Sequence, residues 1–374
     1  MKLQVLQEDL SKALKDAIRF INTRPTLPIL GNFLLSAEKT KLKIKATNLE
    51  MSISLALGAK VEEEGSVTVP AKFFLELITN LNKGQIDIIL VKEELKITAN
   101  DFQASVAIMQ ANDFPAIPET INQKESFVLK RENLTKALSK VLFSSSLDET
   151  RPTLTGILFI FDAPEATNSS VLTLVSSDGF RLSKKSLNLD QKITINQIII
   201  PRTPLLEIIK IAATDDLLFE FKKSDNQLVI KTGETYLSTR LIDGNFPDFQ
   251  KIIPVSSTTN VNVDKNDLER GVKLAAVFAR SEGNIIKMTV NSEGPFSIQS
   301  ETAKAGKENY KIEADVSGGN LDISFNYKFI EEFVSIAEGD SVEIKLTDSV
   351  SPAIFVDPKD KDFLHIIMPV SIKN

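Results

Sequence analysis

Apolar residues recur at helical spacing in three stretches that are spread evenly along the chain. They cover residues 6–21, 129–143 and 263–278, and their spacing predicts an amphipathic helix in each. Asp and Asn side chains can accept the free N–H groups of a first helical turn, and each stretch has one of them directly before a leucine. We therefore expect the helices to start at the pairs Asp9-Leu10, Asn133-Leu134 and Asp267-Leu268.

A second helical pattern follows in each third of the chain, over residues 69–81, 200–212 and 325–337. Proline stands at the start of two of these patterns, where its missing N–H costs nothing. When the three are aligned, a glutamate falls in register within apolar residues. The residues concerned are Pro70 and Pro201, and Glu76, Glu207 and Glu332.

Between the helices, apolar and polar residues alternate in short runs rich in β-branched residues, which predicts strands. Arg-Pro-Thr-Leu begins at Arg24 and again 127 residues later at Arg151, and Phe-Pro follows Asp113 and Asn245. Amphipathic patterns alone are common in unrelated proteins. The shared order of helix, strands, helix and strands, together with these repeats, favours three copies of one unit.

We expect an α+β fold of three structurally similar domains, each with two helices on antiparallel sheets. Their predicted ranges are residues 1–120, 126–254 and 260–374. Domains joined side by side would extend a sheet and leave an unpaired edge at each chain end. Because such edges promote association, a head-to-tail dimer that closes into a ring is expected to remove them.

Composition narrows the possible chemistry. The 374-residue chain has no cysteine and one histidine, His365, so thiolate chemistry is excluded and imidazole chemistry would have to use that residue. Its strand-like surroundings favour a structural role. The N-terminus carries charges and lacks the apolar core of a signal peptide, and no apolar run approaches a membrane span. We expect a cytoplasmic protein without metal or other cofactor.

The net charge of the chain does not show where its basic residues are concentrated. The formal net charge of −6 opposes tight binding of nucleic acid, yet the predicted helices are locally basic. Helices on the inner face of a ring would meet phosphates weakly and without sequence preference, so the ring could slide. The candidate DNA contacts are Lys12, Lys15, Arg19, Arg24, Lys72, Lys136, Lys140, Arg151 and Arg202.

Five motifs resemble those of the bacterial sliding clamps, the beta subunits of DNA polymerase III. They are RPTLPILGNFLL, SSDGFRLS, LIDGNFPDF, LTDSV and the terminal IIMPV, and they stand in the family's order. The resemblance implies three clamp domains per chain and a head-to-tail dimeric ring around duplex DNA. It also implies a nucleoid-associated processivity factor without catalysis, which a separate ATP-driven loader opens.

The resemblance supports Arg24 and Lys72 as DNA contacts, because both match basic positions of the family. In the second Arg-Pro-Thr-Leu loop, the family has a glutamine and an aromatic pair. This chain has Asp148, Pro152 and Thr153 there. We therefore expect no DNA contact from this loop beyond Arg151.

The resemblance also implies a pocket between the second and third domains for short linear peptides of polymerases, loader and repair proteins. Apolar residues near a free C-terminus can line an open groove, although a last strand that completes its sheet is the alternative. The matching residues are Leu154, Ser177, Gly179, Phe180, Arg181, Leu182, Pro247, Ile252, Val350, Ile366, Met368, Pro369 and Val370. Phe180 replaces a histidine of the family, and the tail continues past Val370, so we expect an altered peptide preference.

For the ring interface, we expect the end of the third domain's first helix to meet an edge strand of the first domain. The candidates are Ala276, Val277 and Phe278 on the helix, and Ala104, Val106 and Ile108 on the strand. Phe278 is the strongest candidate, and a place in the core is its alternative.

Two other functions fit parts of the sequence. A repeat adaptor would bind proteins through the C-terminal groove without binding DNA. A carboxylate-dependent hydrolase would use acids such as Asp178, or Asp243 with Asp248, although these segments are also common turn sequences. Charge reversal of Arg24 and Lys72 would separate the clamp from the adaptor.

Overall fold

The computed structural model describes residues 1–164, 168–211, 216–281, 283–302 and 306–371. The chain forms two compact units. The first unit joins residues 1–131 to residues 203–241, and the second joins residues 132–202 to residues 242–374. The α+β class and the antiparallel sheets expected from the sequence are confirmed. No helix in the described ranges is long and apolar enough to cross a membrane.

In the described chain, the first unit contains a five-stranded and a nine-stranded antiparallel sheet. The smaller sheet has the order β5 (Lys60–Glu63), β1 (Lys2–Leu6), β7 (Gln85–Val91), β8 (Glu94–Ala99), β9 (Phe102–Ala107). The larger sheet has the order β10 (Met109–Gln110), β6 (Gly65–Pro70), β2 (Asn32–Glu38), β3 (Lys41–Thr47), β4 (Met51–Gly58), β18 (Thr235–Arg240), β17 (Gln227–Thr232), β16 (Leu217–Lys222), β11 (Ser126–Leu129).

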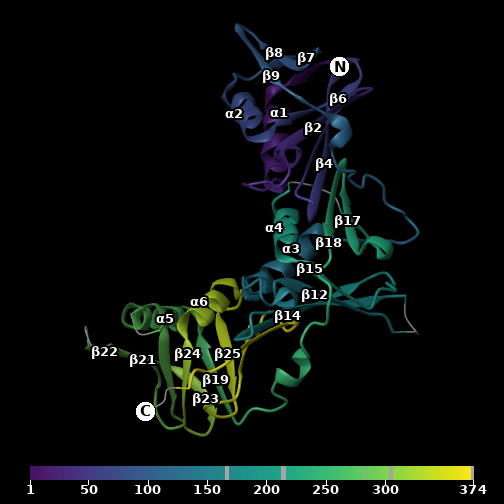
Figure 1. Ribbon diagram of the computed structural model, residues 1–374. Coiled ribbons are helices and arrows are strands. Elements are labelled where there is room, and N and C mark those ends of the chain that lie inside the picture. The colour runs from purple at the N-terminus through teal and green to yellow at the C-terminus, as the bar shows by residue number, and fades with distance from the viewer. Residues whose placement is uncertain (165–167, 212–215, 282, 303–305, 372–374) are drawn as a thin grey trace. The chain divides into compact units, whose positions relative to one another are not determined.

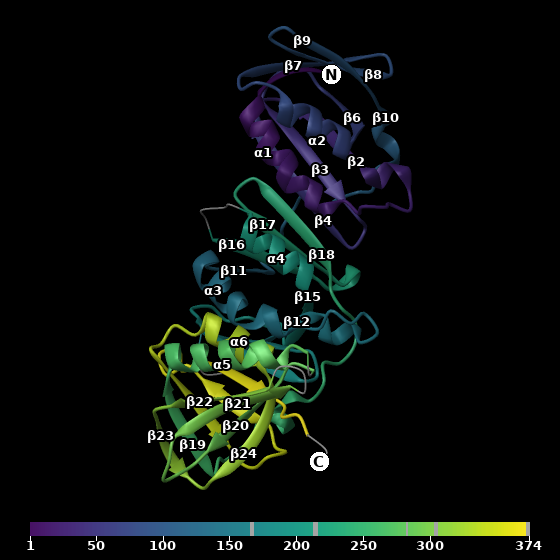
Figure 2. The same ribbon diagram turned by 90° about the vertical axis from the view of Figure 1, so that its left-hand side faces the viewer.

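Two helices of the first unit, α1 (Gln7–Ala17) and α2 (Ala71–Asn80), lie side by side on its nine-stranded sheet (Figure 2). The helix α1 packs on β3 and β4, and α2 packs on β2 and β6. Their sheet-facing side chains are almost fully buried, which is the amphipathic arrangement predicted from the spacing. These residues are Leu10, Leu14 and Ala17 of α1, and Phe74 and Ile78 of α2. The helix α4 (Arg202–Lys210) belongs to this unit from Thr203 onward.

The described part of the second unit also contains two antiparallel sheets, of nine and four strands. The larger has the order β15 (Gln197–Pro201), β12 (Gly156–Asp162), β13 (Ser170–Ser177), β14 (Arg181–Leu189), β27 (Phe363–Ile367), β26 (Ala353–Val356), β25 (Ser341–Leu346), β19 (Thr259–Asp264), β23 (Ala314–Gly318). The smaller has the order β22 (Gly306–Ile312), β21 (Phe296–Thr302), β20 (Ile285–Val290), β24 (Leu321–Asn326).

The second unit holds α5 (Lys265–Ala279), α6 (Tyr327–Ile336) and nearly all of α3 (Arg131–Val141). The helices α5 and α6 pack on each other, and α5 also covers β20, β21 and β22 (Figure 1). One apolar core lies beneath them. Its aromatic members include Phe296, Phe325, Phe333, Phe355 and Phe363.

Both nine-stranded sheets join strands from successive thirds of the chain. In the first unit β4 pairs with β18, with Ile53 opposite Leu237. In the second unit β14 pairs with β27, with Leu182 opposite Ile366. The expected extension of one sheet across a domain junction is therefore present at both junctions.

Helix starts differ from the sequence prediction in detail. The helices α1, α3 and α5 begin at Gln7, Arg131 and Lys265, each two residues before the expected Asp or Asn. In α5 the cap is Asp264, whose Oδ1 accepts the N–H groups of Asn266 and Asp267. Asp267 therefore lies inside the first turn, where its charge still complements the positive end of the helix dipole.

Candidate partner pocket, interface and nucleic-acid surfaces

The Ser-Asp-Gly-Phe motif forms a tight turn between β13 and β14. The Asp178 carboxylate accepts the backbone N–H groups of Phe180 at 2.9 Å and Arg181 at 3.0 Å. The Ser177 hydroxyl accepts the Gly179 N–H and donates to the Arg181 carbonyl. Gly179 has φ +92°, a conformation that side chains rarely adopt. The turn thereby presents the Phe180 ring to solvent, with 60% of the residue exposed.

The Arg181 side chain fixes this turn to its surroundings and does not reach outward. Its guanidinium contacts the carboxylates of Asp178 and Glu332 and donates to the Phe143 carbonyl at 2.8 Å. It also lies 4.5 Å from the centre of the Phe329 ring, which is a cation–π contact. Arg181 is only 8% exposed. It therefore positions the turn and is poorly placed to meet a peptide directly.

The other pocket candidates divide into buried and exposed groups. Leu182 and Ile366 belong to an apolar cluster together with Phe249 and Ile354, and Leu154 is also buried. Exposed or half-buried candidates are Pro247, Ile252, Val350, Met368, Pro369 and Val370. The buried members can form the floor beneath a groove, and the exposed members can contact its occupant.

The C-terminal segment is fastened at two points. The Met368 N–H donates to the Phe180 carbonyl, and the Val370 N–H donates to the Ser324 carbonyl, both at 2.8 Å. Ser324 on β24 and Phe329 on α6 thus contact the candidate pocket residues, although sequence reasoning did not include them. Their patterns are those of an ordinary strand and helix, so only the fold reveals them.

Arg151 lies beside the same turn. A Cβ added to Gly179 would come within 2.8 Å of the Arg151 guanidinium, so glycine is what allows this approach. Asp148 pairs with Arg151 at 3.1 Å. Hydrogen bonds from Thr150 and Arg151 lower the pKa of the Asp148 carboxyl. Arg151, proposed from sequence as a DNA contact, therefore adds a partly neutralised cation to the rim of the peptide-binding candidates.

In the first unit, four of the proposed DNA contacts are exposed. Lys12 and Lys15 line a hollow of about 520 Å³ beside α1, and Lys83 lines it as well. Lys72 lies at the start of α2, where its ammonium is 3.5 Å from the Thr23 carbonyl, next to Arg24. Among the described residues, no carboxylate pairs with Lys12, Lys15, Arg24 or Lys72. These cations are free to meet phosphates.

Other basic candidates are engaged within their own unit. Arg19 pairs with Asp16 and with Glu207, Lys136 pairs with Glu132 at 2.7 Å, and Arg202 donates to the Leu142 carbonyl. These ion pairs reduce the charge that Arg19 and Lys136 offer to phosphates.

Lys140 departs most from its sequence assignment. It is 2% exposed, and its ammonium donates to the Ile336 carbonyl at 2.5 Å. It is not available to a phosphate, so we remove it from the candidate DNA surface. Helical spacing placed it on the polar face of α3 with Lys136, but at Lys140 the end of α6 covers this face, whereas Lys136 is exposed.

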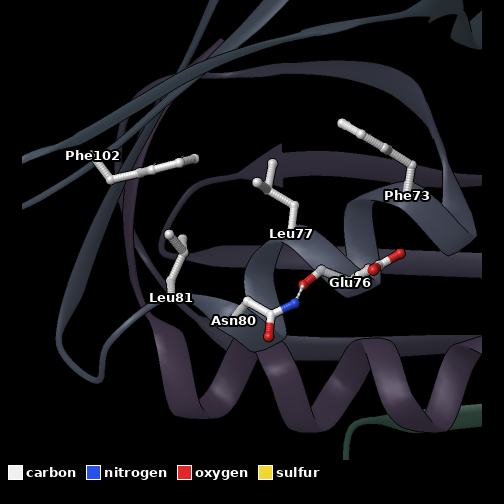
Figure 3. A pocket seen from close by; sticks show the side chains of 6 residues that line it. All are labelled: Phe73, Glu76, Leu77, Asn80, Leu81 and Phe102. Carbon is white, nitrogen blue, oxygen red and sulfur yellow. Dashed lines mark hydrogen bonds between the residues drawn. The ribbon is translucent and has the colours of Figure 1, made fainter.

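An apolar hollow of about 360 Å³ lies between α2 and β9 (Figure 3). Phe73 and Leu77 of α2 and Phe102 of β9 project toward it, with Leu81 at its lower edge. Phe73 is 55% exposed and Phe102 is 37% exposed. The strand β9 is the last strand of its sheet in the described chain. This surface has the exposed apolar side chains and the free backbone edge that an interface needs.

The interface candidates chosen from sequence differ in how far their side chains are exposed. Val106 and Ala276 are 2% and 1% exposed, so both side chains belong to their own cores and we remove them. Ala104 and Ile108 are half-buried. On α5, Val277 is 66% exposed and Phe278 is half-buried, and sequence reasoning missed the exposed Leu274. The strand β22, which α5 covers, is at the end of the four-stranded sheet in the described chain.

Of the residues considered for catalysis, His365, Asp178 and Asp248 have structural surroundings. His365 is fully buried beside Ser183 and stacks on Phe333, and this burial lowers its pKa to about 3. Asp178 is occupied by its turn, and Asp248 is an exposed partner of Lys251. In the described part of the chain, no three His, Cys, Asp or Glu residues are grouped as metal ligands.

Three family models match successive parts of the chain. The N-terminal, central and C-terminal domains of the DNA polymerase III beta subunit match residues 1–118, 128–248 and 250–371.

Individual proteins match over the full length. The beta sliding clamp of Chlamydia muridarum is 27% identical over 374 residues, covering 100% of this chain and 99% of the relative. That of Staphylococcus epidermidis is 26% identical over 382 residues, covering 99% of each. The crystal structure of the DNA polymerase sliding clamp from Bacillus subtilis has a TM-score of 0.93 at 23% identity and covers 100% of both chains. At 23% identity, this structural match supports the fold alone.

Proposed function

Because the chain belongs to the DNA polymerase III beta subunit family, the beta sliding clamps, we propose that two copies close head to tail into a ring that encircles duplex DNA. The protein is a processivity factor for DNA polymerase III and is not an enzyme. The observation that carries this assignment is the match of all three domain models, in order, over nearly the whole chain. Residues 1–120, 126–254 and 260–374 remain our proposed domain ranges.

Weak phosphate contacts would let such a ring slide. Lys12, Lys15, Arg24 and Lys72 are the best-supported contacts, because they are exposed and no described carboxylate pairs with them. A chain with a net charge of −6 does not favour tight binding of a polyanion. We propose that the closed ring, rather than affinity, retains the protein on DNA, and that binding is independent of base sequence.

The ring would close at two equal interfaces. In each, the hollow formed by Phe73, Leu77, Leu81 and Phe102 of one copy would receive the exposed side of α5 of the other copy, with Leu274 and Val277. The edge strands β9 and β22 would then lie at the same interface, where pairing would satisfy their free backbone groups. A head-to-tail contact of this kind closes when the rotation between subunits permits it.

Polymerases, the clamp loader and repair proteins would bind through short peptides at the Ser177–Arg181 turn and the C-terminal segment. Exposed Phe180 and Val350, with half-buried Met368, would receive apolar side chains, and Arg151 would receive a carboxylate. We place the protein in the bacterial cytoplasm with the nucleoid. An adaptor that binds these proteins without DNA is the alternative that the test below separates.

The test combines mass in solution with retention on DNA. Light scattering should give a mass near twice 41.3 kDa. With a clamp loader and ATP, the protein should remain on nicked circular DNA through gel filtration and be lost once the circle is cut. Charge reversal of Arg24 and Lys72 should reduce loading without changing the mass. A monomer, or retention indifferent to DNA ends, would refute the ring and favour the adaptor.

A further inference from the structure

The buried Lys140 joins parts of the second unit that come from different thirds of the chain. It lies on α3, in the proposed second domain, while its partners belong to the proposed third domain. Its ammonium donates to the Ile336 carbonyl at 2.5 Å and pairs with Glu338 at 3.1 Å. It also lies 5.5 Å from the centre of the Phe363 ring. These contacts compensate the cost of burying a charge, which is several kcal/mol when partners are missing.

The partner of Lys140 is the end of a helix. The last carbonyls of α6 accept no N–H from within the helix, and they form the negative end of its dipole. The Lys140 ammonium donates to the Ile336 carbonyl, and the Lys265 ammonium of α5 donates to the Ala337 carbonyl, each at 2.5 Å. Lys265 therefore caps α6 from within the same proposed domain. Lys140 does so from the neighbouring one.

The helix α6 also holds the candidate pocket. Its Glu332 and Phe329 contact the guanidinium of Arg181, and Arg181 anchors the turn that presents Phe180. The strand leading into α6 supplies the Ser324 carbonyl that receives the Val370 N–H. Both sides of the pocket therefore depend on where α6 lies relative to the second domain.

We propose that Lys140 is a positioning residue for partner binding, which locks α6 to the second domain and thereby preorganises the peptide pocket. It does so without contacting the peptide or DNA. The inference rests on the proposed pocket function. Fixing a site before its ligand arrives reduces the ordering cost of binding, so loss of the lock should weaken binding at a distance.

The test uses Lys140→Met, which keeps the length of the side chain and removes the charge. The probe is a fluorescein-labelled hexapeptide that carries leucines for the apolar residues of the candidate pocket and one aspartate for Arg151, measured by fluorescence anisotropy on the full dimer. We expect its Kd to rise about fivefold to tenfold, a size typical of mutations that act through a coupled element. Lys345→Met, which removes a half-buried charge paired with Glu343, should leave Kd unchanged.

Lys265→Met separates positioning from simple loss of a helix cap. It should lower the melting temperature as Lys140→Met does but leave the peptide Kd within about twofold, a change of under half a kcal/mol. An unchanged Kd in Lys140→Met, or an equal loss in Lys265→Met, would overturn the inference.

A second readout does not need the peptide. The chain has no cysteine, so spin labels can be placed on Ser139→Cys of α3 and Ser335→Cys of α6, both exposed. The distance distribution between them should broaden in Lys140→Met and stay narrow in Lys265→Met. An unbroadened distribution refutes the lock. Failure of the peptide to bind the unmodified protein would instead refute the proposed pocket.

Discussion

Truncation of Phe73 is expected to dissociate the ring. Phe73 lies on α2 at the rim of the apolar hollow, with 55% of the residue exposed. A phenylalanine has about 150–250 Å² of surface to bury, so roughly 80–140 Å² remains for a partner to cover. At about 25 cal/mol per Å², Phe73→Ala removes about 2–3 kcal/mol from one interface.

The closed ring doubles this effect, because each of its two interfaces contains one Phe73. The dimer should therefore lose about 4–6 kcal/mol, which raises its dissociation constant about 10³- to 10⁴-fold. Sedimentation equilibrium over a range of concentrations measures that constant. It also distinguishes a weakened dimer from an unfolded chain when the melting temperature is recorded in parallel.

Leu147→Ala provides the matched control. Leu147 is 78% exposed and lies in a loop of the second unit, so its truncation should leave the dissociation constant unchanged. A change of less than threefold in Phe73→Ala would show that the hollow is not the interface. A twofold smaller free-energy loss than expected would indicate that only one such contact forms per dimer, which is incompatible with a closed head-to-tail ring.

Three further predictions concern buried or anchored charges. The pKa of the buried His365 is lowered to about 3. As the pH falls below about 6.5, the unfolded chain therefore takes up a proton first, and the free energy of unfolding declines by up to about 1.4 kcal/mol per pH unit. The melting temperature of His365→Phe should decline less over this pH range. Burial raises the pKa of Glu308, and neither of its carboxylate oxygens has a hydrogen-bond partner among the described residues. The charged carboxylate therefore costs stability at neutral pH, so Glu308→Gln should melt higher at pH 7. This gain should vanish below about pH 4, where the wild-type group is protonated in both states. Arg181→Met should lower the free energy of unfolding by about 2–4 kcal/mol, since it removes a charged hydrogen bond and a cation–π contact. It should also weaken binding of the peptide probe. Calorimetry that shows no change in stability would refute the anchoring role.

Much of the fold follows from local patterns. The three first helices and three second helices are present near their predicted positions, because burial of Leu10 and Leu14 in α1, or Phe74 and Ile78 in α2, needs only helical spacing. Caps were less predictable. Asp264 and Asp267 carry the same side chain three residues apart, and only the entry path of the chain decides which one caps α5.

The candidate sites depended more on tertiary structure. The turn at Asp178 could be expected from its residue types, but Lys136 and Lys140 look equivalent in sequence, one turn apart on the same helix. One is exposed, and the other is buried against α6. Likewise, Phe73 reads as an ordinary position of an amphipathic helix. That it faces a hollow beside β9 follows from packing between distant segments, which local patterns do not encode.

The pairing of β4 with β18, and of β14 with β27, has a consequence for anyone who would dissect this protein. Cutting the gene at the matched family boundaries, after residue 118 or residue 248, would strip each of these strands of its neighbour. Every fragment would then expose the unpaired N–H and C=O groups of a full strand edge, which promotes misassembly with other chains during expression. Isolated domains should therefore be made with charged substitutions along β4 or β14, or expressed together with the segment that supplies the missing strand.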